Sequence, residues 1–477
     1  MLENLSADKI VSNIIEKKIS AEEVTDYYLQ RIKKYNPVIN AIVSLKDEEE
    51  IKAEAKEKDF TKNSDNKLKL LYGLPLAVKD LFDVKGIPTT YGIKEFKNNI
   101  PTKNSLIVDR LINHGAIIIG KTNVPEFAVG AHTNNKLFGP TANVYDTNSS
   151  AGGSSGGSAA AIAAELVPMS DGSDMMGSCR IPAAFANIYG IRPTPGLIPV
   201  ERNVSQKIDL PHLSTAGCLA RTPNDMSLML DAISGKHPSD PLSFDLQSTF
   251  TNSNLSEFQF SKVKIGWLGD IQGQYLFEAD ILELCEKSLQ TLEQHKLQVE
   301  LLKINMKTNI IWDSWTTLRA SILYQDIIDM KLENISEMHP GIVWEHHKGQ
   351  NITDDDISNA LKQRNICMHE IDNLFNKFDF LALPAAQIFP FDKETDYPKK
   401  IGRTGLDTYH RWMEVTALAS LLGLPTMSVP VGFNKDGLPM GMQIIAKKGN
   451  DLELVAFAKK YEDCLLYTSD AADDVRS

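Results

Sequence analysis

One segment, residues 151–185, constrains the fold more than any other part of this sequence. It reads AGGSSGGSAAAIAAELVPMSDGSDMMGSCRIPAAF, so four glycines surround Ser154 and Ser155 and a run of alanines follows. Glycine adopts backbone angles that are closed to other residues, and it lets main chains approach closely. We therefore expect a constrained turn that carries Ser154 or Ser155 and leads into a helix buried in a core.

Two other interpretations of the glycine–serine stretch fit less well. A flexible linker has a similar composition, but a linker does not continue into an apolar, alanine-rich segment. A phosphate-binding loop ends in Gly-Lys followed by Ser or Thr, and this stretch has no such ending. A turn at an active site fits the residues best.

Ser178 lies in a second turn, GSDMMGSCRIP, residues 172–182. The backbone N–H groups of Met175, Met176, Gly177 and Ser178 can converge there on one point. Such a nest stabilises the oxyanion of a tetrahedral intermediate. Taken alone, the turn is equally open to a simpler interpretation, in which the serine only completes a tight turn.

Lys79 ends an apolar, strand-like run, LPLAVK, residues 74–79. Partial loss of solvent lowers the pKa of a lysine and makes it a usable base. The alternative is a lysine at a strand end whose aliphatic stem carries the charge out to solvent.

Strands and helices alternate after residue 74, and the first sixty residues are predicted to be helical. The predicted strands are 74–79, 116–120, 263–269, 297–304 and 380–385, and the predicted helices between them include 105–115, 222–233 and 277–296. Alternation of this kind predicts an α/β fold in which helices cover both faces of a central mixed β-sheet.

The composition narrows the function classes. The net charge is −12 without a basic block, which argues against nucleic acid as a partner. Five scattered cysteines lack CxxC spacing, which fits a reducing compartment. The N-terminus does not resemble a secretory signal, and no apolar run approaches the roughly 20 residues that span a bilayer. We expect a cytoplasmic enzyme that does not bind membranes.

Several motifs together resemble the amidase signature family, whose hydrolases use a Ser–cis-Ser–Lys triad. They are GLPLAVKD, GKTNVPEFA, FGPTAN, GGSSGGSAAA, GSDMMGSCRIPAAF and LGLPTMSVPVGF. The resemblance implies Lys79 as the base, Ser154 as the serine after a cis peptide bond, and Ser178 as the nucleophile. The spacing of 24 positions between the serines matches the family and selects Ser154 over Ser155.

The resemblance also implies the chemistry. Ser178 attacks a small carboxylic amide, Ser154 and neutral Lys79 relay the proton, and the N–H groups of residues 175–178 hold the oxyanion. Ala128 and Gly130 would border the acyl pocket. Neither a metal nor a cofactor is expected, and none of the histidines is required, so Glu345-His346-His347 is interpreted as exposed surface.

Two features of the second turn differ from the family or support it. The family commonly has Thr-Gly where this chain has Met175-Met176, which puts the transfer of any one member's substrate preference in doubt. Asp174 and Arg180 are expected to brace the turn, and Cys179 to be a small buried apolar residue.

We predict one amidase domain over residues 1–463, with an N-terminal helical segment at about 1–60, a signature core at about 70–235 and a variable helical region at about 305–420. Residues 464–477 resemble a translated adapter more than native protein and are predicted to be a non-native tail. A homodimer is included as a candidate assembly. The alternative functions are the glutaminase subunit of a tRNA-dependent amidotransferase and an inactive amidase-like binding protein.

Overall fold

The computed structural model describes residues 2–3, 5–60, 69–201, 212–251, 259–332 and 334–466. Its helices are α1 (Ala7–Ile15), α2 (Ala21–Ile39), α3 (Glu48–Phe60), α4 (Leu106–Asn113), α5 (Gly156–Ala163), α6 (Arg180–Phe185), α7 (Pro223–Ile233), α8 (Ile281–Gln294), α9 (Thr308–Asp329), α10 (Pro340–Gln350), α11 (Asp354–Leu374), α12 (Ala417–Leu422) and α13 (Asp451–Leu466). Its strands are β1 (Ile42–Leu45), β2 (Pro75–Lys79), β3 (Ile117–Thr122), β4 (Met169–Asp174), β5 (Tyr189–Arg192), β6 (Thr215–Ala220), β7 (Lys264–Trp267), β8 (Gln298–Leu301), β9 (Phe380–Pro384), β10 (Lys400–Ile401), β11 (Thr404–Gly405), β12 (Thr426–Phe433) and β13 (Pro439–Ala446).

The central sheet has eight strands in the order β4-β6-β5-β12-β13-β9-β7-β8. Strand β7 runs parallel to β8 and β9, and the other neighbours are antiparallel, so the predicted mixed sheet is confirmed. The strands predicted at 74–79 and 116–120 also form, as β2 and β3. They pair with each other and with β1 in a separate three-stranded sheet.

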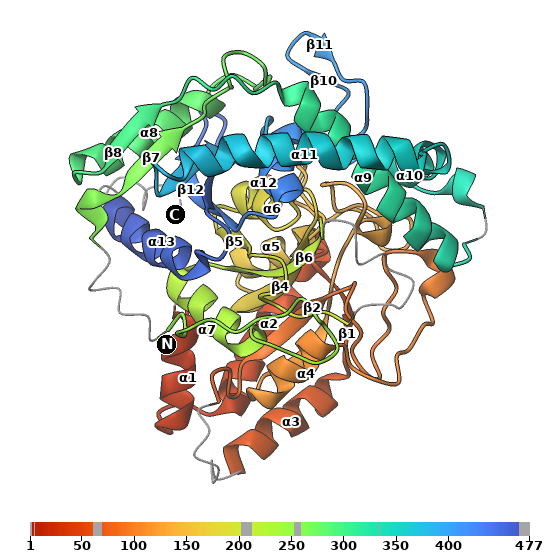
Figure 1. Cartoon of the computed structure of the whole chain (residues 1–477). Coiled ribbons are helices and arrows are strands. Elements are labelled where there is room, and N and C mark those ends of the chain that lie inside the picture. Colours follow the sequence, from red (N-terminus) through yellow and green to blue (C-terminus); the bar gives the residue numbers. More distant parts are fainter. Residues whose placement is uncertain are drawn as a thin grey trace.

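Helices cover both faces of the central sheet, as strand β9 shows. Phe380 and Ala382 enter one core, with residues of α8 and α13, whereas Leu381 and Leu383 enter another, with residues of α9 and α12. Alternate residues of a strand point to opposite faces, so each face has its own core. In Figure 1 the N-terminal helices α1 to α4 lie at the bottom, and α9 to α11 lie toward the top.

Helix ends follow their sequence signals. Ser20 and Glu23 form the predicted capping box at the start of α2, and Thr222 caps α7 just before Pro223. The last helix continues to Leu466, past the predicted start of the tail at Cys464, and residues 467–477 lie outside the described part of the chain.

Candidate active site

Lys79, the last residue of β2, lies at the centre of a buried cluster of hydroxyl groups. Its Nζ donates hydrogen bonds to the Oγ atoms of Ser154 at 2.8 Å, Ser155 at 2.9 Å and Ser173 at 2.9 Å. Its backbone N–H donates to Asp171 Oδ1 at 3.1 Å, which fixes the strand end. Burial lowers the pKa of Lys79 from 10.5 to about 8, because a charged ammonium loses its hydration there.

The three hydroxyls match the hydrogen-bonding capacity of the lysine in both of its protonation states. An ammonium has three N–H bonds, one for each serine. When Lys79 is neutral, two N–H bonds remain and one hydroxyl can turn to donate to the nitrogen lone pair. A proton can therefore move from a serine to Lys79 within contacts that already exist. Ser173 was not among the residues predicted from the sequence.

The turn at Ser154 is built by glycines in close contact with other segments. The peptide bond between Gly153 and Ser154 is cis, as the family resemblance implied. Gly152 has a φ of +72°. A Cβ on Gly153 would lie 3.0 Å from the backbone of Ala131 and His132, closer than ordinary contacts allow. The glycines therefore let this turn pack against the 131–132 backbone.

Asp174 organises the loop that carries Ser178. It accepts hydrogen bonds from the N–H groups of Gly177 at 2.9 Å and Cys179 at 3.1 Å, and its ion pair with Arg180 is completely buried. Burial alone would raise the pKa of Asp174, but the Arg180 guanidinium holds it well below its usual range. The expectation that Asp174 and Arg180 brace this loop, and that Cys179 is buried, is confirmed.

Ser178 is 6% exposed, and its carbonyl accepts the N–H of Ser155 at 3.2 Å, so the two serine turns lie side by side. Among the described residues its hydroxyl has no hydrogen-bond partner. The backbone N–H groups of Met175, Met176 and Ser178 also have none in the described part of the chain, whereas Gly177 already donates to Asp174. Three of the four N–H groups expected in the oxyanion hole are therefore free for a ligand.

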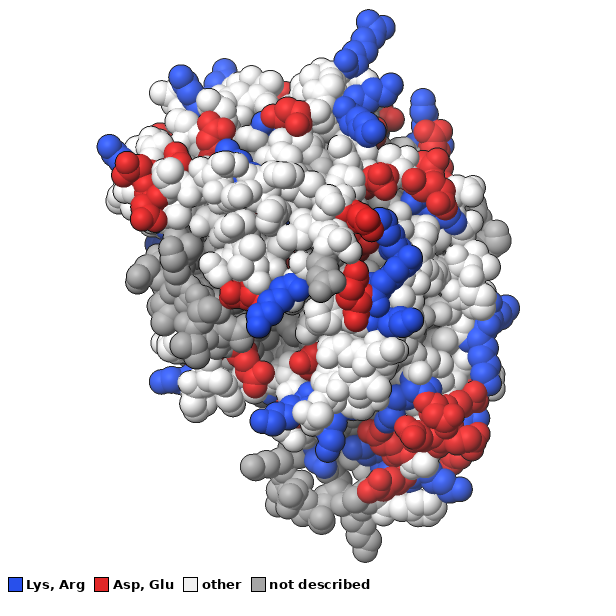
Figure 2. All heavy atoms as spheres, turned by 90° about the vertical axis from the view of Figure 1, so that its right-hand side faces the viewer, with Lys and Arg blue, Asp and Glu red and all other residues white. Residues whose placement is uncertain are grey.

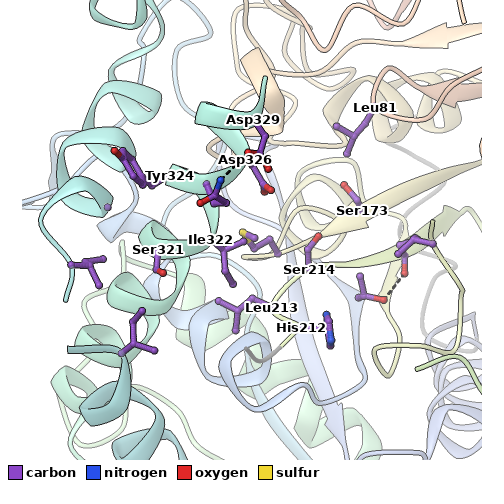
Figure 3. Close-up of a pocket in the computed structure, with 18 of the residues that line it drawn as sticks. Leu81, Ser173, His212, Leu213, Ser214, Ser321, Ile322, Tyr324, Asp326 and Asp329 are labelled. Atoms are coloured by element: carbon purple, nitrogen blue, oxygen red, sulfur yellow. Dashed lines mark hydrogen bonds between the residues drawn. The ribbon is translucent and has the colours of Figure 1, made fainter. Parts of the chain in front are cut away.

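A cavity of about 430 Å³ opens beside this cluster. Ser173 and Met175 line it on one side, and Ile322 and Asp326 of α9 line it on the other (Figure 3). An adjoining cavity of about 570 Å³ shares Asp326 and is also lined by Phe127 and Val129.

Comparison with known proteins identifies the family. The amidase family model matches residues 23–455. The chain belongs to the amidase signature family. It is 31% identical to an acylamidase of Rhodococcus erythropolis over 462 residues, which cover 96% of this chain and 95% of that protein. It is 30% identical to a glutamyl-tRNA(Gln) amidotransferase subunit of Saccharolobus solfataricus, over 94% of each chain. The crystal structure of a bacterial aryl acylamidase of this family matches with a TM-score of 0.89 and 28% identity, over 96% of each chain.

Two further expectations for this amidase concern residues around the cavities. Ala128 and Gly130 have φ angles of +56° and +90° and line neither cavity, although their neighbours Phe127 and Val129 line the second one. The interpretation of Glu345 as exposed surface is wrong. Its side chain is completely buried, because it pairs with Arg319 of α9.

The surface and the remaining polar groups of the amidase add little to this site. Among the described residues, no group of three or more His, Cys, Asp or Glu side chains could hold a metal ion. None of the described helices is both long and apolar enough to span a membrane. On the face shown in Figure 2, basic and acidic side chains are interspersed.

Proposed function

We propose that this amidase hydrolyses a small carboxylic amide through a covalent acyl-enzyme on Ser178. Ser178 Oγ attacks the carbonyl carbon while its proton passes to Ser154 Oγ, and the proton of Ser154 passes to neutral Lys79 Nζ. Collapse of the tetrahedral intermediate breaks the C–N bond, and Ser154 returns a proton to the departing amine. Water then attacks the ester by the same route and releases the acid.

The observation that carries this proposal is the 2.8 Å contact between Lys79 Nζ and Ser154 Oγ, inside a fully buried cluster. A lysine of pKa about 8 is neutral often enough near neutral pH to act as a base. The free N–H groups beside Ser178 supply the donors for the oxyanion.

The cavity supports a neutral or cationic amide over one with a free carboxylate. None of the described residues that line it is Lys or Arg, while four are acidic: Glu201, Asp326, Asp329 and Asp354. Burial and the charge of Asp329 raise the pKa of Asp326 to about 6, so this carboxylate is ionised at pH 7. An anionic substrate would meet like charges there. This disfavours glutamine, and with it the glutaminase alternative.

Hydrolysis of a neutral aryl amide tests the proposal, with three variants. Ser178→Ala should abolish turnover, and full activity in this variant would overturn the assignment. Ser154→Ala should lower kcat by about 10²–10⁴-fold, the contribution of a positioned acid–base group. Ser155→Ala is the matched control, since its hydroxyl lies equally close to Lys79 but is outside the relay.

Two results would contradict the relay or the substrate class. A larger loss from Ser155→Ala than from Ser154→Ala would place the proton path through Ser155. Ammonia release from glutamine at a higher kcat/KM than hydrolysis of the aryl amide would favour the glutaminase function.

A further inference from the structure

The two methionines that distinguish the Ser178 loop from the common family sequence both contact helix α9. The indole N–H of Trp315 donates to the Sδ atom of Met176 at 3.1 Å. One turn further along α9, Arg319 Nη1 donates to the Sδ atom of Met175 at 3.1 Å. Trp315 is completely buried and Met176 is 1% exposed, so water does not compete for the first contact.

Arg319 is itself held in place from two other segments. Its Nε pairs with Glu345 of α10, and its Nη2 donates to the hydroxyl of Tyr409 at 3.0 Å. Tyr409 in turn donates to Glu345 Oε1 at 2.6 Å, which closes the network. A guanidinium with three fixed partners has little freedom to leave the Met175 sulfur.

We propose that Trp315 and Arg319 are positioning residues that set the geometry of the oxyanion loop through Met176 and Met175. This inference rests on the proposed function, because it concerns the N–H donors beside Ser178. Thioethers are flexible, weak acceptors, so without these donors the two side chains could adopt several rotamers. Fixing both sulfurs fixes the backbone from which the Met175, Met176 and Ser178 N–H groups point.

The same helix lines the substrate cavity. Ile322, Gln325 and Asp326 follow Arg319 within two turns of α9 and face the cavity that Met175 also lines. Helix α9 therefore joins the wall that binds a substrate to the loop that stabilises its transition state. Correct filling of the cavity and correct alignment of the oxyanion donors become parts of one arrangement.

A double-mutant cycle on Trp315→Phe and Met176→Leu tests the inference. The first change removes the N–H donor, and the second replaces the sulfur at nearly constant volume, which cores tolerate well. Each single variant should lower kcat by roughly tenfold with KM within about twofold, because an interaction that acts only in the transition state changes kcat. The double variant should be no slower than the slower single variant, because both changes remove the same contact.

Matched controls separate this effect from a general loss of packing. Trp267→Phe also removes a buried indole donor, on β7, and Met229→Leu changes a completely buried methionine on α7. Both should leave kcat within about twofold at the same melting temperature as the test variants.

The inference is overturned if Met176→Leu and Trp315→Phe keep the wild-type kcat, or if their effects on kcat multiply. If Trp315→Phe does not fold, the result for Met176→Leu still decides. These outcomes differ from failure of the proposed function, in which the wild-type enzyme itself would not hydrolyse the amide.

Discussion

The buried position of Lys79 predicts how activity depends on pH. Only the neutral amine accepts a proton, so kcat/KM should rise with pH and level off above the pKa of about 8. At pH 7 about one molecule in ten carries neutral Lys79, against roughly one in three thousand for a solvated lysine of pKa about 10.5. The burial of this side chain therefore raises the active fraction by about 300-fold, equivalent to about 3 kcal/mol.

The assay is kcat/KM for a neutral anilide, which has no titrating group, between pH 6 and 10. We expect about a tenfold rise per pH unit below the midpoint and a plateau above it. Asp171→Asn provides a second readout, because the Asp171 charge raises the pKa of Lys79. Burial raises the pKa of Asp171 itself to about 6, so it is ionised at pH 8, and its removal should shift the midpoint to lower pH. A flat profile, a midpoint near 10.5 or an upward shift in Asp171→Asn would refute the reasoning.

Two predictions concern the scaffold of the site. Asp174→Asn should lower the free energy of unfolding by about 3–5 kcal/mol in urea titrations, because Arg180 stays buried without its partner. An unchanged urea midpoint would show that this pair does not hold the loop. Gly157→Ala should cost at least about 1–3 kcal/mol, because its Cβ would overlap the backbone of Asn123. Gly405→Ala, with nothing within 4 Å of its Cβ, is the control and should stay within about 0.5 kcal/mol. Equal stability of the two alanine variants would contradict the predicted overlap.

The sequence predicts the apolar strands well and the polar ones poorly. Strands β7 and β9 are short apolar runs with flanking turns, so their pattern is sufficient to locate them. Strand β4 reads MSDGSD, with no alternation of apolar and polar residues, yet all of it is buried. Its side chains are satisfied by distant partners, such as the carbonyl of Ala77 for Ser170 and Lys79 Nζ for Ser173. No local pattern reports such partners.

The same limit applies to single charged residues around the site. The three segments that carry Lys79, Ser154 and Ser178 could be found from local composition and family motifs. Glu345 could not be interpreted correctly, because its neighbours in the sequence are polar and its partner Arg319 lies on another helix. The N–H of Gly177 was expected in the oxyanion hole, but the carboxylate of Asp174, three residues earlier, already accepts it. Only the folded loop shows that competition.

The most direct test of the account is the site at which the enzyme becomes covalently modified. The folded protein would be treated with a fluorophosphonate, whose phosphorus takes the place of the amide carbonyl carbon and whose fluoride leaves, and the labelled residue located by peptide mass spectrometry. We predict a single adduct on Ser178, slowed by a competing aryl amide and absent in Ser178→Ala. An adduct on Ser154 or Ser155, or none on the folded wild-type protein, would contradict the acyl-enzyme mechanism.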